Sequence, residues 1–134
     1  MKTIKILLAI LFFFAQIGYS QQLVQNLNDM YRLKEYEAIF VNKPLKDLIK
    51  EIKPEIKIAF PYSHDPSFDF RFVTHEQLRK RQGTIAENVA LFVDVKETID
   101  WNWETRPKGK EPVWTKEDAE KYGNLIVTRI NLVY

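Results

Sequence analysis

The chain has 134 residues with 20 Lys or Arg, 18 Asp or Glu and a formal net charge of +2, and it contains no cysteine. This length fits one ordinary domain, and the apolar content is high enough for a packed core rather than a disordered tail. The lack of cysteine excludes disulfide bonds, thiol catalysis and a lipoprotein anchor at a leader cleavage point.

The first twenty residues have the pattern of a secretory signal peptide. Lys2 and Lys5 form a basic start, an unbroken apolar run follows, and small residues precede a cleavage point after Ser20. A transmembrane anchor is the alternative, but a bilayer core about 30 Å thick needs roughly 20 apolar residues. Residues 6–17 supply only twelve. We therefore expect a periplasmic or secreted protein with no stable membrane anchor after cleavage.

Cleavage changes what the charge implies. Removing residues 1–20 takes away two lysines and no acid, so residues 21–134 hold equal numbers of basic and acidic side chains. Domains that bind nucleic acid are usually rich in clustered positive charge. The sequence therefore predicts a single domain over residues 21–134 that has no nucleic-acid partner.

The first half of this domain starts with helical periodicity. Apolar residues at helical spacing predict an amphipathic helix over residues 22–34. Residues 36–41 are rich in β-branched and aromatic side chains and predict a strand. Asn42 is then a plausible N-cap for a helix over residues 45–52, which Pro54 ends.

Alternation with a period of two dominates the middle of the chain. It predicts strands over residues 56–60, 68–72 and 89–95, and in the second of these the phenylalanines share one face. Between the last two strands, Thr74 and Gln77 have the spacing of a capping box and predict a short helix.

The last third contains the longest irregular segment. Residues 98–113 are charged, carry Pro and Gly, and predict an extended loop. Thr115 and Asp118 form a second capping-box pattern that opens a short helix, and residues 125–133 predict a final strand.

These elements together predict an α+β fold with a mostly antiparallel sheet and helices on one face. Over residues 36–96 the order is strand, helix, strand, strand, helix, strand, which is the ferredoxin-like βαββαβ order. An N-terminal helix precedes it, and a C-terminal helix–strand unit follows it.

The tryptophan-rich loop is the strongest candidate for a binding site. Trp101, Trp103 and Trp114 lie close together in sequence with Arg106 between them. Exposed indoles flanked by cations stack on sugar rings, peptide aromatics or lipid headgroups. The alternative is that the indoles cover the edge of the core, since large aromatic side chains usually bury most of their area. We expect these four residues to bind a glycan, peptide or protein partner.

Catalytic and cofactor chemistry has weaker support. The two histidines, His64 and His75, each lie beside a carboxylate, as a metal site or an acid–base pair requires. A strand of about 17–20 Å separates them, too far to share one ion. The glycines form no phosphate-binding loop. We therefore expect no cofactor and no metal. A small hydrolase or metal-dependent enzyme that uses His64 or His75 with nearby carboxylates remains an alternative.

Three segments carry a resemblance to other proteins. Residues 42–48, 53–57 and 114–123 resemble recurring segments in small exported proteins of the Bacteroidota, to which no activity is assigned. The resemblance implies an exported bacterial protein and no particular mechanism. The leading functional hypothesis is a non-enzymatic binding module. A second alternative is an inhibitor or assembly factor of a cell-envelope complex.

Overall fold

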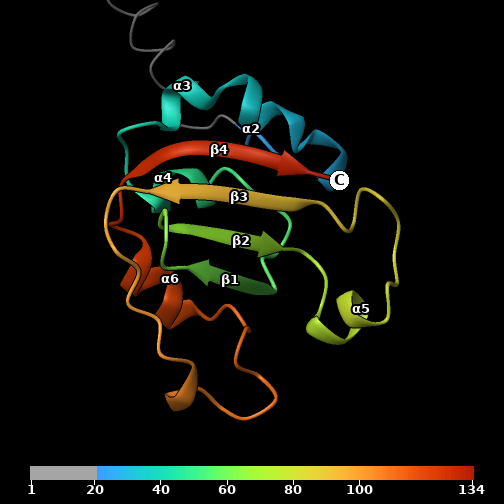
Figure 1. Ribbon diagram of the computed structural model, residues 1–134. Coiled ribbons are helices and arrows are strands. Elements are labelled where there is room, and N and C mark those ends of the chain that lie inside the picture. Colours follow the sequence, from blue (N-terminus) through green and yellow to red (C-terminus); the bar gives the residue numbers. More distant parts are fainter. Residues whose placement is uncertain (1–20) are drawn as a thin grey trace, which may run out of the picture.

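The computed structural model describes residues 21–134, so the predicted leader peptide over residues 1–20 lies outside the described residues. The described chain is an α+β fold built on one antiparallel sheet (Figure 1). Its strands are β1 (Ile58–Tyr62), β2 (Ser67–Arg71), β3 (Ala90–Val95) and β4 (Val127–Val133). They are neighbours in chain order, β1-β2-β3-β4, so the sheet is an antiparallel meander.

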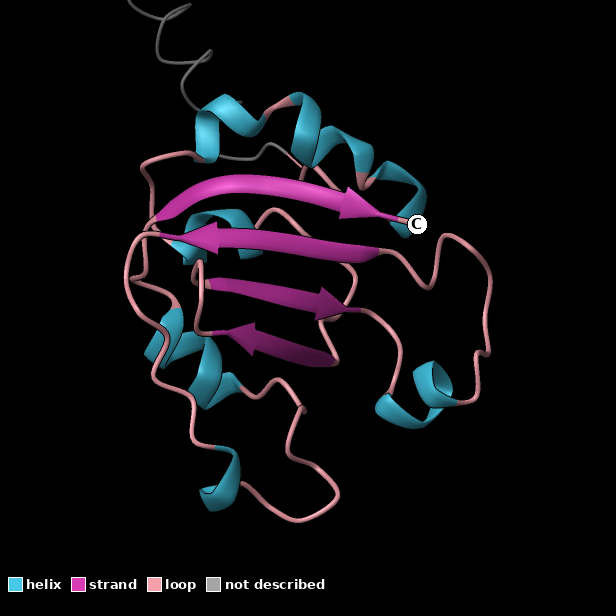
Figure 2. Ribbon diagram, viewed as in Figure 1, coloured by secondary structure: helices cyan, strands magenta, loops and turns pink. Residues whose placement is uncertain are grey.

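Short helices surround the sheet (Figure 2). The α-helices are α2 (Tyr31–Glu35), α3 (Glu37–Phe40), α4 (Leu45–Ile49), α5 (His75–Arg79) and α6 (Lys116–Tyr122), and the 3₁₀ turns are η1 (Leu27–Asp29) and η2 (Trp103–Thr105). The extended loop predicted over residues 98–113 is confirmed, with η2 as its one helical turn. Within residues 21–134, no helix has the length and apolar content that crossing a bilayer requires.

Both predicted capping boxes are confirmed. The Thr74 hydroxyl accepts a hydrogen bond from the Gln77 backbone N–H at 3.1 Å, and the Gln77 side chain accepts one from the Thr74 N–H at 2.9 Å. Thr115 and Asp118 make the equivalent pair of bonds at 3.1 and 3.0 Å and open α6. Each pair satisfies two backbone donors that the first helical turn leaves free.

The strand predicted over residues 36–41 is wrong, because α3 occupies this segment. Strand propensity is a weak preference that tertiary contacts override. As a helix, the segment buries Phe40 in the core and brings the carboxylate of Glu37 to the backbone of β4. Without this strand the ferredoxin-like order is not confirmed.

The N-terminal helix predicted over residues 22–34 forms only in part. Its last turns are η1 and α2, whereas Val24 is extended and forms a parallel bridge with Ile52. The Val24 N–H donates to the Glu51 carbonyl, and the Val24 carbonyl accepts from Lys53, both at 2.9 Å. This bridge buries the Val24 side chain completely, which explains why the helical periodicity fails there.

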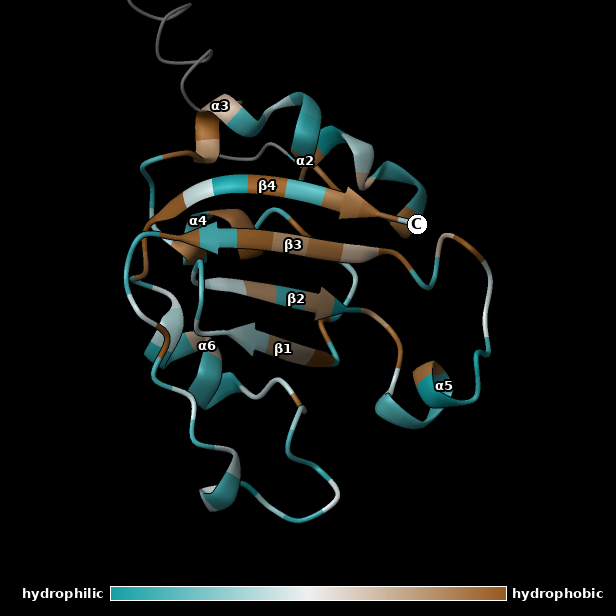
Figure 3. Cartoon of the chain, viewed as in Figure 1, coloured by the Kyte–Doolittle hydropathy of each residue, from teal (hydrophilic) through white to brown (hydrophobic). Residues whose placement is uncertain are grey.

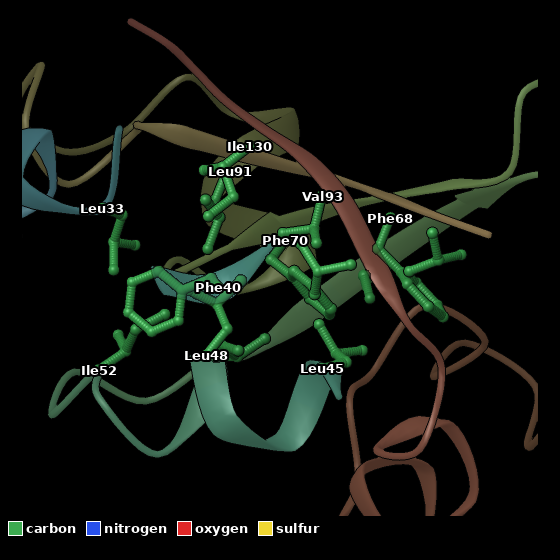
Figure 4. Packing of buried hydrophobic residues seen from close by; sticks show 14 of the residues in the cluster. Leu33, Phe40, Leu45, Leu48, Ile52, Phe68, Phe70, Leu91, Val93 and Ile130 are labelled. Carbon is green, nitrogen blue, oxygen red and sulfur yellow. The ribbon is translucent and has the colours of Figure 1, made fainter. Parts of the chain in front are cut away.

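The core lies between one face of the sheet and α4. Figure 4 shows Phe68 and Phe70 of β2 lying near Leu45 and Leu48 of α4, with Phe40 beside them. The predicted alternation is confirmed on this face for residues 68–72 and 89–95. In residues 56–60 it is reversed, because Ala59 faces the core while Ile58 and Phe60 pair with Arg71 and Asp69 on the opposite face. Its fully or nearly fully buried strand residues are Ala59, Phe68, Phe70, Leu91, Val93, Val95, Val127 and Ile130.

The opposite face of the sheet is open over much of its area. In the view of Figure 1, α4 lies behind the sheet and no described helix crosses in front of the strands. Figure 3 shows polar and apolar segments alternating along β4, as expected for a strand with one buried and one solvated face. Pairing places Phe60, Asp69, Phe92 and Asn131 in one cross-strand row on this open face.

Candidate ligand-binding site

Arg106 is fully engaged within the protein. Its guanidinium makes two hydrogen bonds to the Asp118 carboxylate, at 2.7 and 3.0 Å, and further bonds to the Glu111 and Val113 carbonyls at 2.6 and 2.7 Å. The guanidinium carbon also lies 3.7 Å from the centre of the Trp101 ring. The fork and planar faces of arginine suit this combination of bidentate pairing and stacking. Arg106 therefore closes the long loop onto α6.

Asp118 is the buried partner of Arg106. Burial on its own raises the pKa of a carboxyl, but hydrogen bonds from Arg106 and Thr115 outweigh burial and hold the pKa of Asp118 below its usual range. Its side chain is only 8% exposed. The carboxylate thus stays ionised and joins the loop to the first turn of α6.

Trp101 and Trp114 are half-buried in an aromatic cluster at the edge of the core. Their rings are nearly parallel, at 7° and 6.4 Å between centroids, and both lie near Phe68 and Tyr122. The Trp101 indole N–H is buried and has no hydrogen-bond partner among the described residues. These two indoles therefore occupy the position that the alternative interpretation assigned to them, beneath the long loop.

Trp103 differs from the other two indoles because it is exposed. It is 41% exposed and packs one side against Trp101, with ring centroids 5.6 Å apart at 60°. A small hollow of about 250 Å³ opens beside it. We call it the Trp103 hollow; it is lined by Pro61, Tyr62, Ser63, Ile99, Trp101 and Trp103.

A second hollow of about 410 Å³ lies over the open sheet face. We call it the sheet hollow. Its lining includes Tyr62, His64, Ser67, Phe92, Arg129 and Asn131. The Tyr62 and Phe92 rings are 6.4 Å apart at 31°. Because Tyr62 lines both hollows and is 47% exposed, its side chain forms the border between them.

Two ion pairs lie on the open sheet face. Arg129 Nε lies 3.0 Å from Asp94 Oδ2, and Arg71 binds both oxygens of Asp69 at 2.8 and 3.1 Å. Asp69 is almost completely buried although it is on the open face, because Arg71 and the neighbouring rings of Phe60 and Phe92 surround it. The open sheet face therefore presents aromatic and polar groups together with paired arginines, and the carboxylate of Asp65 also lines the hollow.

The two histidines lie in different places. His64 lines the sheet hollow, whereas His75 begins α5, packs edge-on against Phe60 at 6.2 Å and lines another hollow with Trp114. Among residues 21–134, no group of three or more His, Asp or Glu side chains is arranged to hold a metal ion. The structure does not bring the two histidines into one site.

A larger hollow lies elsewhere and has a different character. It measures about 940 Å³ and lies between the N-terminal segment, residues 84–87 and Tyr134. Its polar side chains bond within their own turns: Asn26 accepts from the Asn28 N–H at 3.0 Å, and Glu87 from the Thr84 N–H at 3.3 Å. Tyr134 is its one aromatic lining residue. It offers few groups that converge on a ligand.

Two residues of the candidate site, Tyr62 and Phe92, lie outside the predicted set. Tyr62 follows the predicted strand over residues 56–60, and β1 extends two residues further to include it. Phe92 alternates with the buried Leu91 and Val93, so its parity alone marks it as an aromatic side chain on the solvated face. A large aromatic residue on the polar face of a strand is the signal that identifies both.

Comparison of the chain with protein-family models, curated proteins and solved structures found no match. The geometry of the two hollows is therefore the basis for a functional proposal.

Proposed function

We propose that the chain is an exported, non-enzymatic binding module that holds a ring-shaped group, such as one sugar unit, in the Trp103 hollow. The predicted leader peptide and the resemblance to exported Bacteroidota proteins support the periplasmic or secreted location. The binding role is supported chiefly by one observation: Trp103 is exposed and rests against the half-buried Trp101 beside Tyr62.

Rigid support makes this arrangement suited to binding. Exposed aromatic side chains lose little conformational entropy when a neighbour already fixes them. Trp103 packs on Trp101, which the Arg106 guanidinium and the aromatic cluster hold in turn. The four predicted binding residues thus divide into one that offers a surface, Trp103, and three that support it: Trp101, Arg106 and Trp114.

The size of the hollow favours a single ring. Pockets for drug-sized molecules measure roughly 300–1,000 Å³, and the Trp103 hollow is slightly smaller, at about 250 Å³. The apolar faces of Trp103 and Tyr62 suit the C–H face of a sugar ring or an aromatic group. An inhibitor or assembly factor would use the same surface to hold an aromatic side chain of a protein partner.

Ligand-observed NMR with single-ring probes tests this proposal. The probes are the methyl glycosides of glucose, galactose, mannose and N-acetylglucosamine, with p-cresol as an aromatic analogue. We expect at least one probe to bind and Trp103→Ala to weaken it about tenfold, which corresponds to 1.4 kcal/mol. Because Trp103 is exposed, the melting temperature should hardly change. Unchanged binding together with a marked loss of thermal stability would show that Trp103 is structural and reject the proposal.

A further inference from the structure

We propose that the ligand of this module is a neutral oligosaccharide, which runs from the Trp103 hollow across Tyr62 onto the open sheet face. The proposal rests on the proposed function, since it extends the same site. The ligand also occupies the sheet hollow as a second binding region, where it contacts Phe92, Arg129 and Asn131.

The first observation that supports an oligosaccharide ligand is that the two hollows meet at Tyr62. Tyr62 lines both, and it is exposed enough to contact a ligand that passes from one to the other. Beyond it, the half-buried Phe92 ring lies 6.4 Å away at a tilt of 31°. Trp103, Tyr62 and Phe92 therefore offer successive aromatic surfaces, an arrangement that suits a chain of linked rings better than one isolated ring.

The polar groups around Phe92 suit hydroxyl groups. In the register, Phe92 pairs with Asn131, and the next row pairs Asp94 with Arg129. Asn131 is exposed and offers both an amide donor and a carbonyl acceptor. Arg129 pairs with Asp94 through Nε at 3.0 Å, and its side chain is 68% exposed, so it is accessible to a ligand. Sugar hydroxyls both donate and accept, and such mixed side chains match them.

Charge pairing favours a neutral ligand over an anionic one. The two arginines of the open face, Arg71 and Arg129, each lie within 3.1 Å of a carboxylate oxygen. Binding of a polyanion depends on unpaired cations that replace its counterions. The paired arginines reduce that attraction, and the carboxylates of Asp65 and Asp94 beside the hollow oppose it.

The sheet edges argue against an extended peptide added as another strand. At the β1 edge, the Ala59 N–H donates to the Pro112 carbonyl at 2.8 Å, and Trp114 donates to the Lys57 carbonyl at 3.0 Å. In the middle of the β4 edge, Glu37 and Lys34 bond both backbone groups of Ile130, at 2.6 and 2.8 Å. Strand addition needs such groups free along an edge, so a ligand is directed to the face of the sheet.

Binding assays with linear neutral hexasaccharides of glucose, mannose and N-acetylglucosamine test the proposal. A hyaluronan fragment of equal length serves as the anionic comparison. We expect one neutral hexasaccharide to bind at least about tenfold more tightly than its own methyl glycoside. Phe92→Ala and Asn131→Ala should remove most of that gain and leave binding of the methyl glycoside unchanged.

Control variants separate failure of this proposal from failure of the proposed function. Trp103→Ala should weaken the binding of the hexasaccharide and of the methyl glycoside alike. Tyr36→Ala is a matched control for Tyr62→Ala, because both tyrosines are 47% exposed and Tyr36 lies between α2 and α3, outside the lining of both hollows. Tyr36→Ala should change neither the affinity for the hexasaccharide nor the affinity for the methyl glycoside.

Four results would overturn the extension. If the hexasaccharide binds no more tightly than the methyl glycoside, or Phe92→Ala has no effect, the site ends at Tyr62 and only the proposed function stands. Tighter binding of hyaluronan would contradict the neutral ligand. Binding of neither hexasaccharides nor methyl glycosides, with p-cresol still bound, would reject the sugar and leave an aromatic group of a protein partner as the occupant.

Discussion

At the scale of single residues, Arg106 has a structural role that could not be predicted from its position in a tryptophan-rich loop. All of its contacts are internal, to Asp118, Trp101 and two backbone carbonyls. Its contribution to binding is therefore indirect, through the position of Trp101 beneath Trp103.

Replacing Arg106 should destabilise the fold. Arg106→Ala leaves Asp118 buried without its charged partner, and breaking a buried pair in this way costs about 3–5 kcal/mol. Urea denaturation measures the free energy of unfolding. Lys108→Ala, an exposed cation of the same loop, is the control and should change it by less than about 0.5 kcal/mol. Equal effects of the two variants would show that the Arg106–Asp118 ion pair adds nothing to stability.

The same ion pair predicts a loss of stability in acid. The pKa of Asp118 is lower in the folded chain than its usual value, so its stabilising effect is complete above the pKa of the unfolded state, about 3.9. It disappears as the pH falls through the folded pKa. The stability difference between the natural chain and Asp118→Asn should thus narrow from pH 7 to pH 3 in urea titrations. A constant difference would contradict this role of the carboxylate.

The sequence identified the loop residues of the site better than the sheet residues. Trp101, Trp103 and Trp114 stand out because tryptophan is rare and the segment is irregular. Which indole is exposed depends on packing of Trp101 and Trp114 against Tyr122 and against Phe68, a residue of β2 that lies far from the loop in sequence. Only the folded chain shows that Trp103 remains outside this cluster.

At the scale of elements, α2 and α3 protect the outer edge of β4. The Glu37 carboxylate accepts the Ile130 N–H, Lys34 donates to the Ile130 carbonyl, and the two side chains pair at 3.0 Å. The hydrogen bond from Ile130 is the main reason that the pKa of Glu37 is lowered. An unprotected strand edge invites pairing with a second chain.

Removing this protection should promote self-association. Lys34→Ala combined with Glu37→Ala frees both backbone groups of Ile130 and should cost about 1–3 kcal/mol through the unsatisfied groups. Light scattering coupled to size-exclusion chromatography should then show dimers or larger species. Glu35→Ala on the same exposed surface is the control. If the double variant keeps the same mass distribution as the control, Lys34 and Glu37 do not guard the edge.

Adjacent strands offer a direct test of which sheet face is the core. Phe70 of β2 is fully buried beside α4, and Phe92 of β3 is half-buried on the opposite face. Phe70→Ala should lower the free energy of unfolding by about 3–5 kcal/mol, and Phe92→Ala by about 1 kcal/mol, as expected where little buried area is lost. Similar losses in urea denaturation would contradict the assignment of Phe92 to an open face.

Elements that depend on neighbouring residues were predicted correctly from the sequence. Prediction failed where contacts between residues far apart in sequence determine the structure. The capping boxes at Thr74 and Thr115 are contained within four residues, so the sequence shows them completely. Residues 36–41 form α3 because the helix brings Glu37 to β4, a contact that spans 93 positions in sequence. Strand propensity within six residues carries no information about such a partner.

At the scale of the whole molecule, the two faces of the sheet have different roles. One face packs on α4 and supplies the core, while the open face and the edge beside the long loop carry the two hollows that share Tyr62. The α+β class with an antiparallel sheet was predictable from periodicity. The meander order was not, because alternation identifies a strand but not its neighbours.

The most direct test of the binding site is NMR of the indole N–H signals during titration with the methyl glycosides of glucose, galactose, mannose and N-acetylglucosamine. The chain has three tryptophans, so it should give three indole signals. If a sugar binds in the Trp103 hollow, the Trp103 signal should move along a saturable curve, while the Trp114 signal should move much less. A Trp103 signal that stays in place while a probe binds, or throughout the titration with all four probes, would contradict sugar binding in this hollow.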